Sequence, residues 1–229
     1  MERRMEMKKS GIDMLHGPIW NKIPLFALPV AATAILGQLF NASDLAVVGN
    51  FAGEARTAAV AAVGANSSVV SLVVNLFTGV ALGANVVIAG AIGREDTDAA
   101  QRAVHTALLF AVIGGFVIAL LGEFMAEPLL RMMSVPDEVL PLALLYLRIY
   151  LIGMPVILLY NFEAAIFRSI GDTKVPLATL AISGVINVIL NLLFVIVLGM
   201  TVDGVAIATV ISNAISAVIL FFRLRKAND

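Results

Sequence analysis

A single acidic residue interrupts the first long apolar stretch of this 229-residue chain. Asp44 lies ten residues before Glu54, hence at most about 15 Å from the end of the stretch at 1.5 Å per helical residue. An ionisable group at membrane depth costs at least about 2.5 kcal/mol, so it needs a partner or a role. We expect Asp44 to bind a proton or a cation, with Gln38 and Asn41 as supporting polar groups on a partly shared helix face. The alternative is a buried aspartate held only by hydrogen bonds between helices.

Further polar side chains recur late in the chain at helical spacing. Ser183, Asn187 and Asn191 follow one another every four residues, and Thr209 lies at a depth comparable to that of Asp44. Carboxylate, amide and hydroxyl oxygens are ligands that Na⁺ or a proton relay can use. We therefore predict a cation or proton site at Asp44, Asn187, Asn191 and Thr209. Amide pairs are also common contacts between membrane helices, and this second interpretation of the asparagines stays open.

A second acidic residue, Glu163, lies five residues before Arg168, about 7–8 Å from the end of its apolar stretch. A long side chain at this depth can extend to the interface or pair with a basic neighbour. We expect such a structural role for Glu163 rather than a site.

Prolines and glycines within the apolar stretches predict features of helix geometry and packing. Pro29 and Pro155 are expected to kink their helices. Gly79 and Gly83 have the spacing of a helix-packing motif, so we expect another helix to pack against them.

The composition is that of an integral membrane protein. Apolar residues make up 60% of the chain and charged residues 14%, with a mean hydropathy of +0.99. The net charge of -1 gives no electrostatic attraction for nucleic acid, and we expect no such partner. The sequence has no phosphate-binding GxxxxGK[ST] loop and no HExxH zinc motif. We therefore expect no enzyme activity and no cofactor, but a secondary transporter driven by an ion gradient.

Gaps between the charged residues predict an all-α protein with six transmembrane helices. The gaps cover residues 23–53, 57–93, 103–122, 139–167, 175–202 and 204–222. Residues 1–22 are expected to form an amino-terminal segment, 23–222 a six-helix lobe and 223–229 a short tail. Residues 123–141 mix methionine, proline and acidic residues, which is typical of a short interfacial elbow.

The basic residues are distributed unequally between the two sides of the membrane that this topology defines. One side carries twelve, namely Arg3, Arg4, Lys8, Lys9, Lys22, Arg94, Arg102, Arg168, Lys174, Arg223, Arg225 and Lys226, and the other only Arg56, Arg131 and Arg148. The positive-inside rule therefore predicts a multi-pass protein of the cell membrane with both termini in the cytoplasm.

Several motifs together resemble the multidrug and toxic compound extrusion (MATE) transporters, within the class that includes lipid-linked oligosaccharide flippases. They are QLFNASDLAVVG at 38–49, AEPLLRMM at 126–133, YLRIYLIGMP at 146–155, RSIGDTKVP at 168–176, NVILN at 187–191 and GVAIAT at 204–209. The resemblance extends over nearly the whole chain.

This resemblance implies one six-helix lobe, the amino-terminal one, of a two-lobe fold around a central cavity. It implies a cation site at Asp44, Asn187, Asn191 and Thr209, although some members have a second aspartate in place of Asn191 and many have glutamine in place of Gly90. The implied activity is H⁺- or Na⁺-coupled export of amphipathic, often cationic, molecules by alternating access. The implied partners are membrane lipid, a small amphipathic substrate and a second lobe. Because alternating access needs two bodies and the charge bias disfavours an inverted pair, we expect the second lobe to come most simply from a parallel homodimer. The alternatives are a lipid or oligosaccharide flippase, a non-transporting six-helix subunit or a truncated product.

Overall fold

A computed structural model describes residue 12 and residues 19–228, and every regular element in these residues is helical. The elements are α1 (Ile19–Phe51), η2 (Gly53–Ala55), α2 (Arg56–Gly93), α3 (Thr97–Met132), α4 (Leu140–Ile152), α5 (Met154–Ser169), α6 (Lys174–Leu192), η3 (Leu193–Val197) and α7 (Val202–Asn228). The basic residues Arg3, Arg4, Lys8 and Lys9 of the predicted amino-terminal segment lie outside the described residues.

The helices are long and apolar enough to cross a membrane. Five qualify alone, and the pair α4 and α5, bent by 54° at a short break, adds a sixth. The predicted all-α fold is therefore confirmed, with one span broken in the middle.

One boundary differs from the sequence prediction. The expected elbow at 123–141 begins only at Met133, because α3 continues to Met132. An i,i+4 ion pair between Arg131 and Glu127 supports this last part of the helix. Helix α7 continues to Asn228, so the predicted tail is helical over residues 223–228.

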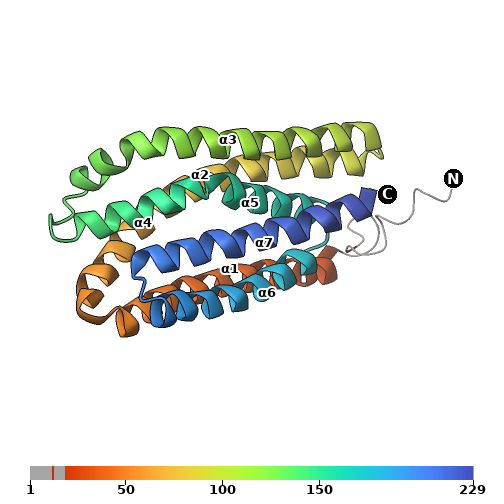
Figure 1. Cartoon of the computed structure of the whole chain (residues 1–229). Helices are drawn as coiled ribbons and strands as arrows, with labels where there is room; N and C mark the ends of the chain where they lie inside the picture. The colour runs from red at the N-terminus through yellow and green to blue at the C-terminus, as the bar shows by residue number, and fades with distance from the viewer. Residues whose placement is uncertain (1–11, 13–18, 229) are drawn as a thin grey trace.

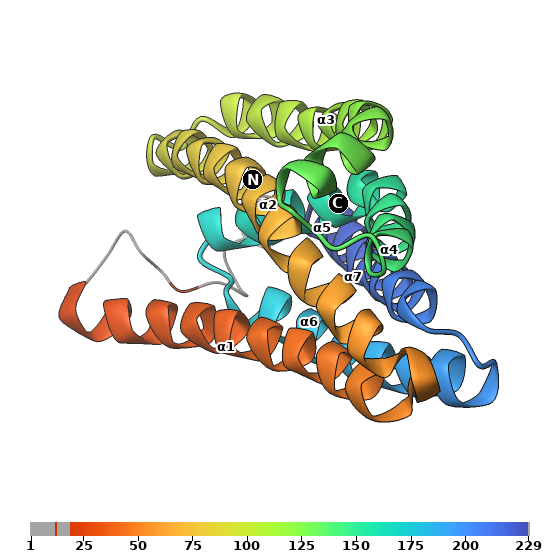
Figure 2. The same cartoon turned by 90° about the vertical axis from the view of Figure 1, so that its left-hand side faces the viewer.

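The helices run roughly side by side, and their connections lie at two ends (Figure 1). We call one the Gly199 end, with the connections at 52–55, 133–139 and 198–201, and the other the Asp172 end, with those at 94–96 and 170–173. The carboxyl terminus lies at the Asp172 end (Figure 1). In the end-on view, α3, α4 and α5 gather on one side, while α1 lies along the opposite side with α6 (Figure 2).

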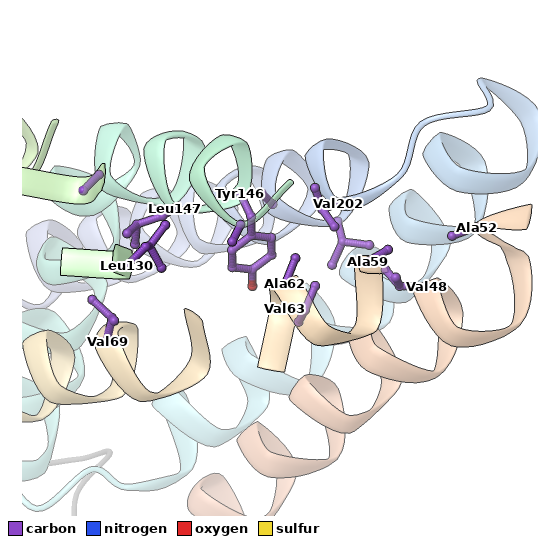
Figure 3. Packing of buried hydrophobic residues seen from close by; sticks show 14 of the residues in the cluster. Val48, Ala52, Ala59, Ala62, Val63, Val69, Leu130, Tyr146, Leu147 and Val202 are labelled. Carbon is purple, nitrogen blue, oxygen red and sulfur yellow. The ribbon is translucent and has the colours of Figure 1, made fainter. Parts of the chain in front are cut away.

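Two buried apolar clusters form the core. The first includes Val48, Ala62 and Tyr146 (Figure 3), and its members come from α1, α2, α3, α4, η3, the first residue of α5 and the start of α7. The second surrounds α5, whose residues 162–167 are all buried. A helix buried on all sides is a central helix, so α5 forms the axis of the Asp172 half.

The break between α4 and α5 follows from residues around Gly153. Pro155 stands in the first turn of α5 and lacks a backbone donor, which confirms the predicted kink at this proline. A Cβ atom on Gly115 of α3 would overlap the Pro155 backbone, and one on Gly153 would overlap Val210 of α7. The bend therefore brings α5 against α3 and α7 at positions where a side chain does not fit.

Other sequence predictions about packing have different outcomes. Helix α1 runs without interruption through Pro29, where the expected kink stays a prediction. The expectation for Gly79 and Gly83 is wrong within the described residues, because no atom lies within 4 Å of a Cβ placed on either glycine. Both glycines lie on an exposed part of α2.

Candidate cation site

A hydrogen-bonded cluster joins α1, α6 and α7 in the half of the molecule toward the Gly199 end. Asn191 Nδ2 donates to Asp44 Oδ1 at 2.5 Å, and Thr209 Oγ1 lies 3.3 Å from Asp44 Oδ2. Asn191 Nδ2 also lies 3.2 Å from Asn187 Oδ1, and Asn187 Nδ2 lies 3.4 Å from Thr209 Oγ1. The structure thus brings together the four residues that the sequence analysis selected.

The cluster is closed off from its surroundings and rich in acceptors. Asp44, Asn187 and Asn191 are 5%, 4% and 0% exposed, so bulk water does not solvate the carboxylate. Asn191 Oδ1 is buried without a hydrogen-bond partner. Asp44 forms no ion pair with any basic side chain in the described ranges. A buried carboxylate without a counter-charge, beside an unused amide oxygen, suits a proton or a hard cation such as Na⁺.

The polar face of α6 continues away from the cluster. Thr179, Ser183, Asn187 and Asn191 recur every four residues along α6, and all four are buried. Ser183 does not join the Asp44 cluster, because its hydroxyl accepts a 2.6 Å hydrogen bond from Ser216 of α7. The α6–α7 contact is therefore polar over several turns.

A close contact one turn away fixes α1 against α6. Phe40 of α1 packs where Gly184 of α6 has no side chain, and a Cβ atom on Gly184 would overlap the phenyl ring. Phe40 precedes Asp44 by one turn, and Gly184 precedes Asn187 by about one turn. This contact therefore holds the helix register that places Asp44 beside Asn191.

The two supporting polar groups predicted on α1 lie elsewhere. Gln38 and Asn41 are exposed, and the hydrogen bonds of the cluster join only Asp44, Asn187, Asn191 and Thr209. Successive residues of a helix are rotated by about 100° about its axis. Asn41, three residues before Asp44, therefore points partly away from the direction of Asp44, and Gln38, six residues before it, points further away.

Two tyrosines of α4 extend the site in a way that the sequence analysis missed. Tyr146 and Tyr150 stack with their ring centroids 5.9 Å apart, and Tyr146 is buried. The Tyr146 ring points from α4 toward Ala62 and Val63 of α2 (Figure 3). The sequence signal that could have identified them is the i,i+4 spacing of two tyrosines in an otherwise apolar helix, which places both rings on one helix face.

The interface position and the basic partner expected for Glu163 are not found. Its side chain is 0% exposed, so it does not extend to an interface, and neither carboxyl oxygen has a hydrogen-bond partner. Arg168, the expected basic neighbour, lies on the same helix but forms no ion pair with it. The reason is the position of α5 at the centre of the lobe, which sequence periodicity alone did not reveal.

An open hollow of about 560 Å³ lies at the Gly199 end, but no residue of the Asp44 cluster lines it. It is formed by partly exposed residues of α3 and α4, including the ion pair between Arg148 and Glu123 at 2.9 Å. This surface hollow is therefore separate from the cation cluster.

Comparison with known proteins gives one consistent result. A family model described as MatE matches residues 29–193. The probable multidrug resistance protein YoeA of Bacillus subtilis strain 168 is 31% identical over 214 residues, which are 91% of this chain and 45% of that protein. The FAD transporter of Shewanella oneidensis is 28% identical over 87% of this chain and 44% of its own length. The chain thus spans about half the length of these relatives.

Solved structures show the same relation. An outward-facing MATE family transporter of the MOP superfamily superposes with a TM-score of 0.86 at 26% identity, over 94% of this chain and 47% of that one. An inward-facing structure superposes with a TM-score of 0.75 at 25% identity, over 87% of this chain and 45% of that one. The described helices are therefore similar to one half of these structures, and more similar to the outward-facing form.

Proposed function

Because the chain belongs to the MatE family of membrane transporters, we propose that it is one six-helix lobe of a cation-coupled exporter. Its cargo is an amphipathic, often cationic, drug or metabolite that leaves the cell in exchange for H⁺ or Na⁺. The relatives named above are a probable multidrug resistance protein and an FAD transporter.

The observation that carries this proposal is the Asp44 cluster. A cation or proton bound there would neutralise a carboxylate that three helices enclose, and its release would leave a buried charge. Binding and release therefore favour different arrangements of α1, α6 and α7. A ligand shifts a conformational equilibrium by its difference in affinity between the two states, which is the requirement for coupling.

An exposed polar face on α2 supports a water-filled cavity beside the lobe. Gly64, Ser68, Ser71, Asn75 and Gly79 share one helix face at i, i+4, i+7, i+11 and i+15, and all five are exposed. Asn75 lies near the middle of this 38-residue helix, where contact of its amide with lipid would be costly. Water or a second lobe on this face removes that cost, as a cavity between two lobes requires.

The orientation that we propose places the Asp172 end in the cytoplasm and the Gly199 end outside. It rests on the twelve basic residues assigned to one side and three to the other. The lobe superposes better on the outward-facing structure than on the inward-facing one, which supports an outward-facing state. In this orientation, Asp44 would then exchange its cation with the outside.

The test is substrate efflux from cells or proteoliposomes that contain the chain together with whatever second lobe it uses. Asp44→Asn keeps the size of the side chain and removes the charge, and we expect at least a tenfold loss of gradient-driven efflux. Glu54→Gln removes an exposed acid at the same end and should transport normally. Unchanged efflux by Asp44→Asn would refute the coupling role.

The same preparation identifies the coupling ion and the class of substrate. An imposed pH gradient without Na⁺ drives efflux only if H⁺ is coupled, and a Na⁺ gradient at constant pH drives it only if Na⁺ is coupled. A cationic dye and FAD, compared side by side, represent the two kinds of cargo for which the relatives are named.

A further inference from the structure

Glu163 lies deep in the lobe, and the proposed coupling scheme gives it no role. It is 0% exposed, and both of its carboxyl oxygens are buried without a hydrogen-bond partner. Such groups are rare in folded proteins, because a buried polar group without partners loses its interactions with water and gains none.

Glu163 lies within the buried apolar cluster of the Asp172 half. Helix α5 packs against α2, α3 and α7, and the adjacent residues Phe162 and Ala164 belong to the buried cluster of this half. Toward the Asp172 end, α5 and the helices packed against it carry the titratable or charged groups Asp98, Arg102, His105, Tyr160, Arg168, Lys174, Arg223, Arg225 and Lys226, and the connections carry Arg94, Glu95, Asp96 and Asp172. None of these forms an ion pair or hydrogen bond with Glu163, so no described cation balances a carboxylate there.

We propose that Glu163 is a second proton-binding site of the lobe, separate from Asp44 and exchanging its proton at the Asp172 end. In the described conformation the side chain is the neutral carboxylic acid, because only this form tolerates an unpaired apolar environment. On release the O–H bond breaks, the proton passes to water as H₃O⁺, and a carboxylate remains. That carboxylate needs water or a donor, so release requires α5 to loosen from its neighbours.

The position of Glu163 indicates the side from which the proton is exchanged. It lies six residues before Ser169, the last residue of α5, or about 9 Å along the helix axis. The connection after α5 is folded inward, since Thr173 is buried and its hydroxyl also lacks a hydrogen-bond partner. Asp44, in contrast, belongs to the half toward the Gly199 end. The two acids therefore occupy different halves of the lobe and can meet water in different conformations.

The use of Glu163 in transport rests on the proposed function, but the presence of its proton can be measured without transport. Infrared spectra of the purified full chain in lipid, recorded in H₂O and D₂O, show the C=O stretch of protonated carboxyl groups. Above about pH 6 exposed aspartates and glutamates are ionised, so the remaining signal comes from buried acids.

We expect a protonated-carboxyl band above about pH 6 that shifts in D₂O, declines as the pH rises within the folded range, and loses one component in Glu163→Gln. Glu163→Met, of similar size and without titration, serves if the glutamine variant does not fold. Glu54→Gln is the matched control with an exposed acid and should leave the band unchanged.

Two results would overturn the proposal. In the first, Glu163→Gln and Glu163→Met both keep the full band, which means that Glu163 is ionised in the folded protein. In the second, the Glu163 component neither shifts in D₂O nor changes with pH, which means that the acid never exchanges its proton. The Asp44→Asn variant separates the test of Glu163 from the test of coupling. Its spectrum should keep the Glu163 component of the band, whether or not Asp44 binds the coupling cation.

Discussion

Asp44 and Asn191 form the shortest polar contact of the cluster, and in the proposed scheme the charge of this pair controls which cation binds. With asparagine at 191 the cluster contains one carboxylate, whose oxygen lies 2.5 Å from the amide nitrogen. Two carboxylates at such a distance do not both ionise at low cost, so they share a proton or bind a cation more tightly.

Asn191→Asp therefore tests the coupling ion at the level of one residue. For H⁺ coupling, the second acid makes the pair hold its proton more strongly. The pH dependence of efflux should then move to higher pH by about one unit or more, because release needs a lower proton concentration. For Na⁺ coupling, the half-saturating Na⁺ concentration should fall by about tenfold or more, from the added negative charge.

Asn191→Leu is the control for this experiment, since it removes the amide without adding charge. It leaves Asp44 with one donor fewer and should lower the free energy of unfolding by about 1–3 kcal/mol. A pH and Na⁺ dependence of Asn191→Asp identical to that of the unmodified chain would mean that residue 191 does not contact the transported cation.

The four residues of the cluster could be predicted from sequence because membrane depth is a nearly one-dimensional quantity. Counting residues from Glu54 and the late loops gave comparable depths for Asp44, Asn191 and Thr209, and the helices indeed join them. The depth of a residue does not determine the direction in which its side chain points around the helix axis. Gln38 was therefore expected near the site but is exposed, and the burial of Glu163 was missed.

At the scale of the elements, the contact between Phe40 and Gly184 positions α1 against α6. Gly184→Ala places a methyl group on the Phe40 ring, so α1 must move or the ring must leave its place. Overpacking of this kind costs about 1–3 kcal/mol. We expect a lower thermal unfolding midpoint in lipid or detergent and weaker coupled efflux, because the register that joins Asp44 to Asn191 is disturbed.

Removing the phenyl ring should partly restore the Gly184→Ala protein. Phe40→Ala alone leaves a cavity, but in the double variant this space accepts the new methyl group. The double variant should therefore lose less stability than the sum of the two single losses, by at least about 0.5 kcal/mol. Gly83→Ala is the matched control, because nothing lies within 4 Å of the added Cβ, and the lobe should lose no stability. Additive costs for Phe40→Ala and Gly184→Ala would show that the pair does not set the register.

Helix positions were predictable from the gaps between charged residues, and the break at Pro155 from the proline itself, whereas the end of α3 and the π-helical turn were not. Charges mark where a segment leaves lipid, but α3 continues past Glu123 through the ion-paired turn at Glu127 and Arg131. The π-helical turn Leu193–Val197 after Asn191 likewise has no signal in an uninterrupted apolar run. Both features depend on contacts and local hydrogen bonds rather than on hydropathy.

For the whole molecule, the orientation in the membrane can be tested directly because the chain has no cysteine. Thr173 is buried and unsuitable for labelling, so exposed positions are preferable. We expect a single cysteine at Asp98, at the Asp172 end, to react from the cytoplasm, and one at Ser134, at the Gly199 end, to react with an impermeant reagent from outside. The opposite pattern would reverse the orientation and the side from which Asp44 is reached.

The lobe also presents a surface that a single copy leaves open. The most apolar window of α1 is 0% buried within the lobe, and Asn41 of α1 and Asn75 of α2 are exposed at membrane depth. Each amide placed in lipid would cost several kcal/mol. The relatives of this chain are about twice as long. In those proteins, the additional half can cover the surface that corresponds to the open surface of this lobe.

We predict that the working form contains two lobes, and a second copy of this chain is the simplest source of the other. Alternating access requires one body to move against another. The bias of twelve basic residues to three favours one orientation for every copy, so the two lobes should lie parallel. Single cysteines at Asn41 or Asn75 in two differently tagged copies should crosslink within the membrane, whereas a cysteine at Leu120, an exposed position on α3, should not. A protein that stays monomeric while it exports substrate would contradict the prediction, because one lobe would then expose and close its own cavity.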